Sequence, residues 1–409
     1  MSPTDLDLCR VKFSVKLDQI SEKLSTKVQD AIRSIELTKL DKEFDFFVPQ
    51  IYSAANLGNI LKITPEIIAV TEELEEWISD NYSSFVNPKY GARLANHAVS
   101  YILRICPSYS VKEAKFRILC YYFIIGFIMD DWYDDNTKGE DDGYCSLELK
   151  KIQYFDLVSK EIGEMFEVKG FGGGTDEIDL NQLATKAMNT DMIKEQPFLV
   201  AIANSFEDIY AQSLEINDSM TLGTFWAPFK IDFLLTSESV RWSFTNARMG
   251  KLDSFCVDTY RYFKTKEAGF GNFINIITIL ESINLPQIIK CNPVFVRWLD
   301  MAEKFVGTMN DLLGLQKDLL YGEEDGIIMF KLRKGTSLND AVDEELKLIG
   351  DYVKDYGELR TFILTEFGEK YVQVETFVDF VDSALHGSLY TFRDSIKYGM
   401  KDQIRVDYN

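Results

Sequence analysis

The sequence predicts an all-α protein, and three observations lead to that prediction. Long stretches carry apolar residues at the spacing of amphipathic helices, and alternation of β-branched residues is rarely sustained. Prolines are scarce, with nine in 409 residues, so few positions force a helix to stop. Neither an internal repeat nor a linker of domain-boundary character divides the chain. We therefore expect one large helical domain over residues 46–409, preceded by an N-terminal helical extension over residues 1–45.

Local signals place individual elements. Residues 12–45 are predicted to form one or two amphipathic helices, and residues 44–57 read as an extended segment that enters the core. Thr64 is expected to cap the next helix, with Pro65 at its first position. Glu66 follows in the first turn, where a negative charge suits the helix dipole. A helix is therefore predicted to begin at Pro65.

Two stretches read as loops. Residues 137–146 are TKGEDDGYCS, and residues 169–177 are the glycine-rich KGFGGGTDE. A glycine-rich loop can hold phosphate, but this one lacks the Lys-Ser/Thr pair of a P-loop and the strand that precedes it. We therefore interpret residues 169–177 as a flexible surface connection.

Charge and composition limit the class of protein. The formal net charge is −21, from 65 acidic and 44 basic residues, which disfavours contact with a nucleic-acid backbone. A surplus of carboxylates serves solubility, metal binding or both. Aromatic residues make up 13% of the chain, enough for a large core and for a cavity lined with rings. The composition thus excludes nucleic acid as a partner.

Cysteine usage and the apolar runs predict a soluble cytoplasmic protein without a membrane span. The six cysteines include no CxxC pair, which is typical of reduced thiols. The first residues lack the basic start and apolar block of a signal peptide. The strongest apolar run, residues 121–129, is much shorter than the ~20 residues of a spanning helix. Only two histidines occur, His97 and His386, so we expect chemistry that does not use imidazole.

The first candidate metal site follows an apolar helix face. The segment YYFIIGFIMDDWYDDN, residues 121–136, runs into Asp130, Asp131 and Asp134. Asp130 and Asp134 are four residues apart and share a helix face, where like charges beside an apolar stripe repel unless a cation binds. Ligands that offer only oxygen suit Mg²⁺. The alternative interpretation is an acidic helix end that leads into an acidic loop.

The second candidate site is residues 310–318, NDLLGLQKD, in which Asn310, Gly314 and Asp318 lie along one helix face. The segment resembles the second metal motif of class I terpene synthases, NDxxSxxKE, whose Asn, Ser and Glu hold one Mg²⁺. Asn310 and Asp318 match two ligand positions, and Lys317 matches the basic residue of the motif. Gly314 departs from the pattern because it has no side-chain oxygen, and we expect water to take its coordination place.

Three further segments resemble the same family in order and spacing. Residues 319–345 look like its Gly-acidic turn, apolar helix and GxSLxxAVxE stretch, and residues 260–269, YRYFKTKEAG, resemble YLxxRRxTxG. The family's diphosphate-sensing Arg then falls on Lys264, 46 residues before Asn310. Its linker position falls on Glu267, and its effector position falls on Ala268, which would act through its carbonyl.

Residues 387–398, GSLYTFRDSIKY, resemble GNLDWSxxxxRY, so the Arg-Tyr pair becomes Lys397 and Tyr398. At two places, therefore, a family Arg is Lys, which keeps the charge but loses the two-pronged fork. The chain looks closest to the single-domain microbial-type enzymes, a group that includes octocoral cyclases of similar length. The resemblance implies the family's α-helical bundle around a central cavity.

The resemblance also implies a ligand set. Three Mg²⁺ are expected, with Mn²⁺ as a substitute: Asp130 would bind two ions with a weaker contribution from Asp134, and Asn310 and Asp318 would bind the third. Asp131 would orient Lys264 or Lys397. The residues expected to contact the substrate diphosphate are Lys264, Asn310, Lys317, Lys397 and Tyr398.

The implied substrate is an acyclic all-trans prenyl diphosphate, with geranylgeranyl favoured over farnesyl diphosphate. The expected assembly is a monomer or homodimer. Phe127 and Phe123 lie one and two turns before Asp130, where aromatic faces would attract a carbocation.

Two alternative functions remain at this point. A prenyl-chain-elongating synthase shares the first motif but carries a second aspartate-rich motif in place of NDLLGLQKD, and an acidic helical scaffold would turn over no diphosphate.

Overall fold

A computed structural model describes the chain over residues 8–35, 37–49, 62–135, 197–216, 254–394, 400 and 402–408, with single positions between 229 and 240. The helices of the N-terminal half are α1 (Thr26–Arg33), α3 (Pro65–Tyr82), α4 (Pro88–Ile105), α5 (Ala114–Asp135) and α9 (Pro197–Ile216). Those of the C-terminal half are α11 (Val257–Glu267), α12 (Phe270–Leu280), α13 (Gln287–Lys290), α14 (Pro293–Tyr321), α15 (Ile327–Arg333), α16 (Leu338–Ile363), a π-helical turn (Leu364–Gly368) and α17 (Val372–Asp394).

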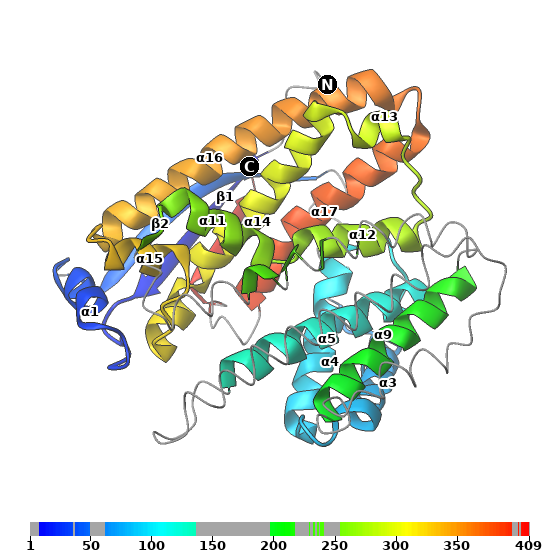
Figure 1. Ribbon diagram of the computed structural model, residues 1–409, viewed down its shortest axis with the longest axis horizontal. Coiled ribbons are helices and arrows are strands. Elements are labelled where there is room, and N and C mark those ends of the chain that lie inside the picture. The colour runs from blue at the N-terminus through cyan, green and yellow to red at the C-terminus, as the bar shows by residue number, and fades with distance from the viewer. Residues whose placement is uncertain are drawn as a thin grey trace.

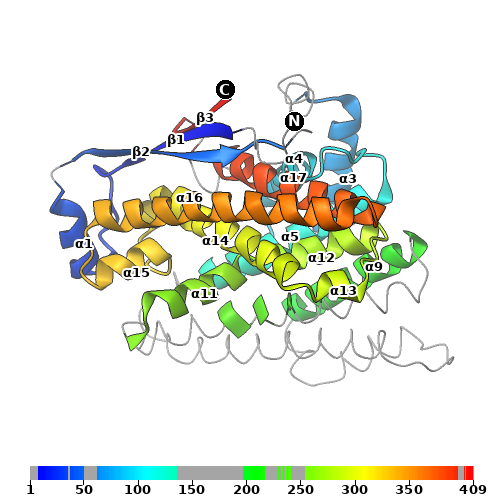
Figure 2. The same cartoon turned by 90° about the horizontal axis from the view of Figure 1, so that it is seen from above.

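The helices form layers around a common hydrophobic core. The long helices α14, α16 and α17 lie side by side, and a small sheet covers one face of this group (Figures 1 and 2). Helices α11 and α12 lie on the face away from the sheet (Figure 2), and α5 and α9 lie side by side on the far side of α12 from α16 (Figure 1). The predicted fold class, a mostly α-helical bundle, is confirmed. Within the described ranges, no helix has the length and apolarity needed to cross a bilayer.

The N-terminal residues form strands, so the prediction of helices over residues 12–45 is wrong except for α1. Strands β1 (Leu8–Lys16), β2 (Lys39–Phe47) and β3 (Ile404–Tyr408) form an antiparallel sheet in the order β2-β1-β3. Alternate residues of β1 are buried, namely Cys9, Val11, Phe13 and Val15. This two-residue period is typical of a strand with one face on the core.

The sheet belongs to the same core as the helices rather than forming a helical extension. The Phe46 ring stacks on Phe305 of α14 with 4.3 Å between centroids, and Phe47 stacks on Tyr356 of α16 at 5.1 Å. The buried His386 lies 3.0 Å from the Phe47 carbonyl oxygen through Nδ1. Burial lowers the pKa of His386 to about 4, so the imidazole is neutral and joins α17 to the sheet.

The predicted start of α3 is confirmed. The Thr64 hydroxyl accepts a hydrogen bond from the Ile67 backbone N–H at 3.4 Å, and Pro65 occupies the first turn. Hydrogen bonds from its own backbone N–H and from Thr64, together with the nearby Lys112, lower the pKa of the Glu66 carboxyl. The local signals at this helix start were therefore sufficient to place it.

Helices α4 and α17 approach so closely that only glycine fits at one position. A Cβ at Gly387 would lie 2.6 Å from the Arg104 carbonyl oxygen and 2.8 Å from the Ile105 Cα. Both neighbours are backbone atoms, so the helices would have to separate. Gly350 on α16 offers the opposite case, because a Cβ there meets nothing within 4 Å.

We predict that Gly387→Ala lowers the free energy of unfolding by about 1–3 kcal/mol, the usual cost of overpacking. The control Gly350→Ala should raise the same quantity by about 0.5–1 kcal/mol, because alanine is the better helix former. Denaturant unfolding of both variants measures the difference. Equal stability of the two variants would show that α4 and α17 are not in contact at Gly387.

Candidate active site

The site is built on the contact between α11 and α14. A Cβ at Gly307 would lie 3.0 Å from the Thr265 Cα, so glycine at this position lets the two helix backbones touch. One turn earlier on α11, the Arg261 guanidinium pairs with the fully buried Glu345 of α16 at 2.6 Å. Lys331 of α15 pairs with the same carboxylate at 2.6 Å. Helix α11 is therefore held at two points one turn apart.

Lys264 lies next to Thr265 and reaches a group of carboxylates. Its Nζ is 2.6 Å from Glu267 Oε2 and 3.3 Å from Asp325 Oδ2, and its side chain is 12% exposed. Burial disfavours the charged form of Lys264, but Asp325 and Glu267 outweigh burial and hold its pKa well above the ordinary value. Lys264 is thus a buried cation that is fixed in place.

The chain changes direction directly after this ion pair. Helix α11 ends at Glu267, and Ala268 caps it by donating its N–H to the Lys264 carbonyl. Gly269 has a φ of +65°, in the left-handed region that favours glycine, and α12 starts at Phe270. The two positions predicted to follow Lys264 functionally, Glu267 and Ala268, therefore lie at a helix break beside α14.

Helix α14 carries the second motif as predicted, on one continuous helix that includes Asn310, Gly314 and Asp318. The Asp318 carboxylate faces the turn after α14, where a Cβ at Gly326 would lie 3.0 Å from Asp318 Oδ2. Burial raises the pKa of Asp318 well above its ordinary value, and the nearby Lys317 only partly opposes this. A carboxyl in such a place gains most from a bound cation.

Sequence reasoning missed Asp311 as a member of this group. A Cβ at Gly326 would lie 3.4 Å from Asp311 Oδ1, and Asp311 Oδ2 accepts a hydrogen bond from the Ile327 N–H at 3.1 Å. Burial raises the pKa of Asp311 to about 7. The signal was present in the sequence, because residues seven apart, such as 311 and 318, share a helix face more closely than 310 and 318 do.

We call residues 322–326, the turn between α14 and α15, the acidic turn. The sequence did not predict that its carboxylates pair with Lys317 and Lys264. Glu323 Oε2 lies 2.7 Å from Lys317 Nζ, and Asp325 pairs with Lys264 as described. Glu324 points elsewhere, to Arg333 at 3.4 Å. The interaction with Lys264 lowers the pKa of Asp325 to about 2, so this carboxylate is ionised.

Carboxyl groups outnumber lysines around this contact. Among the described residues, Lys264 and Lys317 lie near five carboxyl groups, which are those of Glu267, Asp311, Asp318, Glu323 and Asp325. Oxygen donors of this kind suit a hard divalent cation. Within the described part of the chain, no group of three or more His, Cys, Asp or Glu is arranged to hold a metal, so the α14 oxygens could provide only part of a coordination shell.

Helix α5 carries the predicted aromatic residues in a wall shared with α4 and α12. The half-buried Phe123 ring lies 4.0 Å from Tyr101 of α4 and 5.3 Å from Phe273 of α12, measured between centroids. The half-buried Phe127 ring lies 4.8 Å from His97. These contacts place both phenyl rings among other rings at the meeting of three helices.

Several predicted residues fall where side chains are not described. Helix α5 continues through Asp130, Asp131 and Asp134, but their side chains lie outside the described residues. Lys397 and Tyr398 also lie outside them, as does the glycine-rich segment 169–177. The end of α17 is fixed ahead of Lys397 and Tyr398, because Asp394 pairs with Arg104 of α4 at 2.6 Å.

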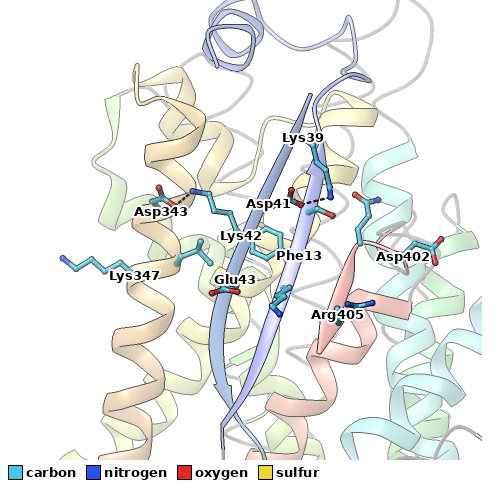
Figure 3. A pocket seen from close by; sticks show the side chains of 13 residues that line it. Phe13, Lys39, Asp41, Lys42, Glu43, Asp343, Lys347, Asp402 and Arg405 are labelled. Carbon is cyan, nitrogen blue, oxygen red and sulfur yellow. Dashed lines mark hydrogen bonds and ion pairs between the residues drawn. The ribbon is translucent and has the colours of Figure 1, made fainter. Parts of the chain in front are cut away.

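A separate pocket lies on the sheet side of α16 and is lined by charged side chains from β1, β2, β3 and α16 (Figure 3). Its volume is about 880 Å³. Lys39 pairs with Asp41 at 2.8 Å, and Lys42 pairs with Asp343. These four charges satisfy one another, and the pocket lies on the face of α16 away from α11 (Figure 2).

A known protein family resembles this chain over part of its sequence. Residues 164–355 match the family described as terpene synthase family 2, C-terminal metal binding. The matched span contains Lys264 and the whole 310–318 motif, and it ends before Lys397. A search among curated proteins finds no match.

Solved structures share the fold at low sequence identity. A crystal structure of α-eudesmol synthase has a TM-score of 0.57 at 16% identity, covering 81% of this chain and 96% of that chain. Germacradien-4-ol synthase from Streptomyces citricolor has a TM-score of 0.56 at 14% identity, covering 80% and 94%. The T181N variant of cucumene synthase has a TM-score of 0.57 at 12% identity, covering 83% and 98%.

Proposed function

We propose that the chain is a class I terpene synthase, which ionises an acyclic all-trans prenyl diphosphate and cyclises the carbocation to a terpene hydrocarbon or alcohol. The observation that carries the proposal is the α11–α14 contact, where the buried, charged Lys264 lies among carboxylates at the end of the second metal motif. The resemblance to octocoral enzymes favours geranylgeranyl over farnesyl diphosphate.

Asn310 and Asp318 are the α14 residues that would hold one divalent cation, and Asp130 and Asp134 are those of α5 that would hold others. The buried carboxyl of Asp318, with its raised pKa, fits this role. We propose three Mg²⁺, with Mn²⁺ as a substitute. Such ions, when bound, stabilise the charge that develops on a departing diphosphate. Gly314 supplies no oxygen, so water completes that part of the shell.

The cationic side chains act on the diphosphate directly. Lys264 keeps its charge although it is buried, so it can donate hydrogen bonds to a diphosphate oxygen in a dry site, where such contacts are strongest. As a lysine it makes single contacts rather than the forked contact of arginine. Glu267 holds its ammonium at 2.6 Å, and Ala268 places its carbonyl at the adjacent helix break. Lys317, Lys397 and Tyr398 are proposed as further diphosphate contacts, with Asp131 as a residue that orients a lysine.

The aromatic wall would guide the cation. The faces of Phe123 and Phe127 would each stabilise a carbocation by about 0.5–2 kcal/mol without forming a covalent bond to it. Their neighbours Tyr101, His97 and Phe273 keep the two rings in place. The departing diphosphate can accept the final proton, so a separate base is not required.

The direct test is incubation of the purified protein with Mg²⁺ and either geranylgeranyl or farnesyl diphosphate, followed by mass spectrometry of the extract. We expect cyclic C20 products to predominate and inorganic diphosphate to be released in equal amount. Cyclic C15 products would retain the class of reaction but change the substrate. A longer linear diphosphate, formed when isopentenyl diphosphate is added, would contradict the proposal in favour of chain elongation.

Asp130→Ala should reduce the rate of diphosphate release by about a thousandfold or more, because a ligand shared by two ions contributes several kcal/mol to the transition state. Single-turnover kinetics at saturating Mg²⁺ measure the loss. Circular dichroism should show an unchanged fold. A rate within threefold of the parent enzyme would refute the role of Asp130.

Gly314→Ser should retain activity and lower the Mg²⁺ concentration for half-maximal rate. A hydroxyl at this position would replace a bound water and avoid the free-energy cost of ordering it, about 1 kcal/mol or about fivefold. Titration of the initial rate with Mg²⁺ measures the change. Complete inactivation of a folded Gly314→Ser protein would show that this helix face does not look onto the metal.

A further inference from the structure

The acidic turn brings carboxylates to Lys264 and Lys317, two lysines proposed to contact the diphosphate. Glu323 pairs with Lys317 at 2.7 Å, and Asp325 pairs with Lys264 at 3.3 Å. We propose that Glu323 and Asp325 act as built-in substitutes for the substrate's diphosphate: they neutralise the two lysines in the free enzyme and give them up when diphosphate binds. The inference rests on the proposed function, because that function assigns Lys264 and Lys317 to the diphosphate.

The two carboxylates are more exposed than the lysines that they pair with, Asp325 much more so than Glu323. The side chains of Lys264 and Lys317 are 12% and 15% exposed, whereas those of Asp325 and Glu323 are 64% and 25% exposed. When Asp325 leaves, Lys264 keeps Glu267 at 2.6 Å, so the buried ammonium is never without an anion. Water can replace the contacts of the solvent-facing Asp325 carboxylate, and a phosphate oxygen can take its place on the lysine.

The backbone of the acidic turn does not need to move for this exchange. The N–H groups of Gly322 and Glu323 both donate to the Asp318 carbonyl, at 2.9 and 3.0 Å. The Tyr260 hydroxyl donates to the Asp325 carbonyl, and Glu324 is tied to Arg333. With the backbone held at these points, rotation of the Glu323 and Asp325 side chains is sufficient.

One consequence is that the two carboxylates compete with diphosphate and weaken its binding. They also keep the lysines charged and in position before substrate arrives, so little rearrangement is left for the binding step. The same competition favours release of the product diphosphate after the reaction. The acidic turn thus lowers the affinity for diphosphate and, through faster release of the product, increases the turnover rate.

The test is the dissociation constant of inorganic diphosphate, measured by calorimetry at fixed Mg²⁺ on the full chain and on Glu323→Gln, Asp325→Asn and the double variant. Each amide keeps the shape of the side chain and removes its charge. We expect each single variant to bind inorganic diphosphate about fivefold more tightly, the upper range for a partly exposed ion pair, and the double variant more tightly still.

Glu324→Gln is the matched control, since it removes a charge from the same turn but its side chain pairs with Arg333. It should leave the dissociation constant of inorganic diphosphate unchanged. Thermal unfolding checks that all variants fold. Equal or weaker binding by folded Asp325→Asn and Glu323→Gln would overturn the inference, as would tighter binding by Glu324→Gln to the same degree. The two proposals can fail separately. If the parent enzyme turns over prenyl diphosphate but the variants bind inorganic diphosphate no more tightly than the parent does, only this inference is rejected and the proposed function stands.

Discussion

The organisation of the site depends on the backbone contact between Gly307 and Thr265. Any side chain at position 307 would push α11 away from α14, because the nearest atom is the Thr265 Cα at 3.0 Å. Such a shift would also move Lys264 away from Asp325, 3.3 Å away in the turn after α14, whereas Glu267 lies on the same helix as Lys264 and would move with it. Gly307 of α14 thus determines the position of the Lys264 ammonium relative to the turn after α14.

The ion pairs of Arg261, one turn before Thr265 on α11, complement that contact. Glu345 is fully buried and receives both Arg261 and Lys331, so three helices share one carboxylate. Removing either cation would leave buried charge without full compensation, which is far more costly than losing a surface pair. Helix α11 therefore has little freedom to shift along α14. A rigid support of this kind suits a cation that must meet a substrate in one geometry.

The sequence was informative where the signal was local. The helical spacing of Asn310, Gly314 and Asp318 and the Thr64 cap both depend on residues within three turns of one another, and both are found on the helices expected. The N-terminal sheet was missed although β1 alternates cleanly, because the pattern was read over a window that also contains α1. Its partner β3 is nearly 400 residues away in sequence, so no local pattern could reveal the pairing.

The site residues divide in the same way. Lys264 and Glu267 were predicted by resemblance and by spacing to the second motif, and their helix α11 packs on α14, which carries that motif. Asp311 and Asp325 were missed because their contacts depend on how the turn after α14 folds back, and helix spacing alone does not describe that turn. Asp130, Asp134, Lys397 and Tyr398 lie where side chains are not described, and the roles of all the predicted site residues remain predictions.

The pairing of β1 with β3 also shapes how this chain reaches its fold. Cys9 is opposite Tyr408 in the register, so the central strand of the sheet acquires its second neighbour only after almost all of the chain has been synthesised. Until then one edge of β1 presents unpaired backbone groups, the kind of edge at which chains aggregate. Contacts this distant in sequence also close slowly. Expression conditions that slow synthesis or supply chaperones should therefore affect the yield of this protein more than that of a purely helical bundle.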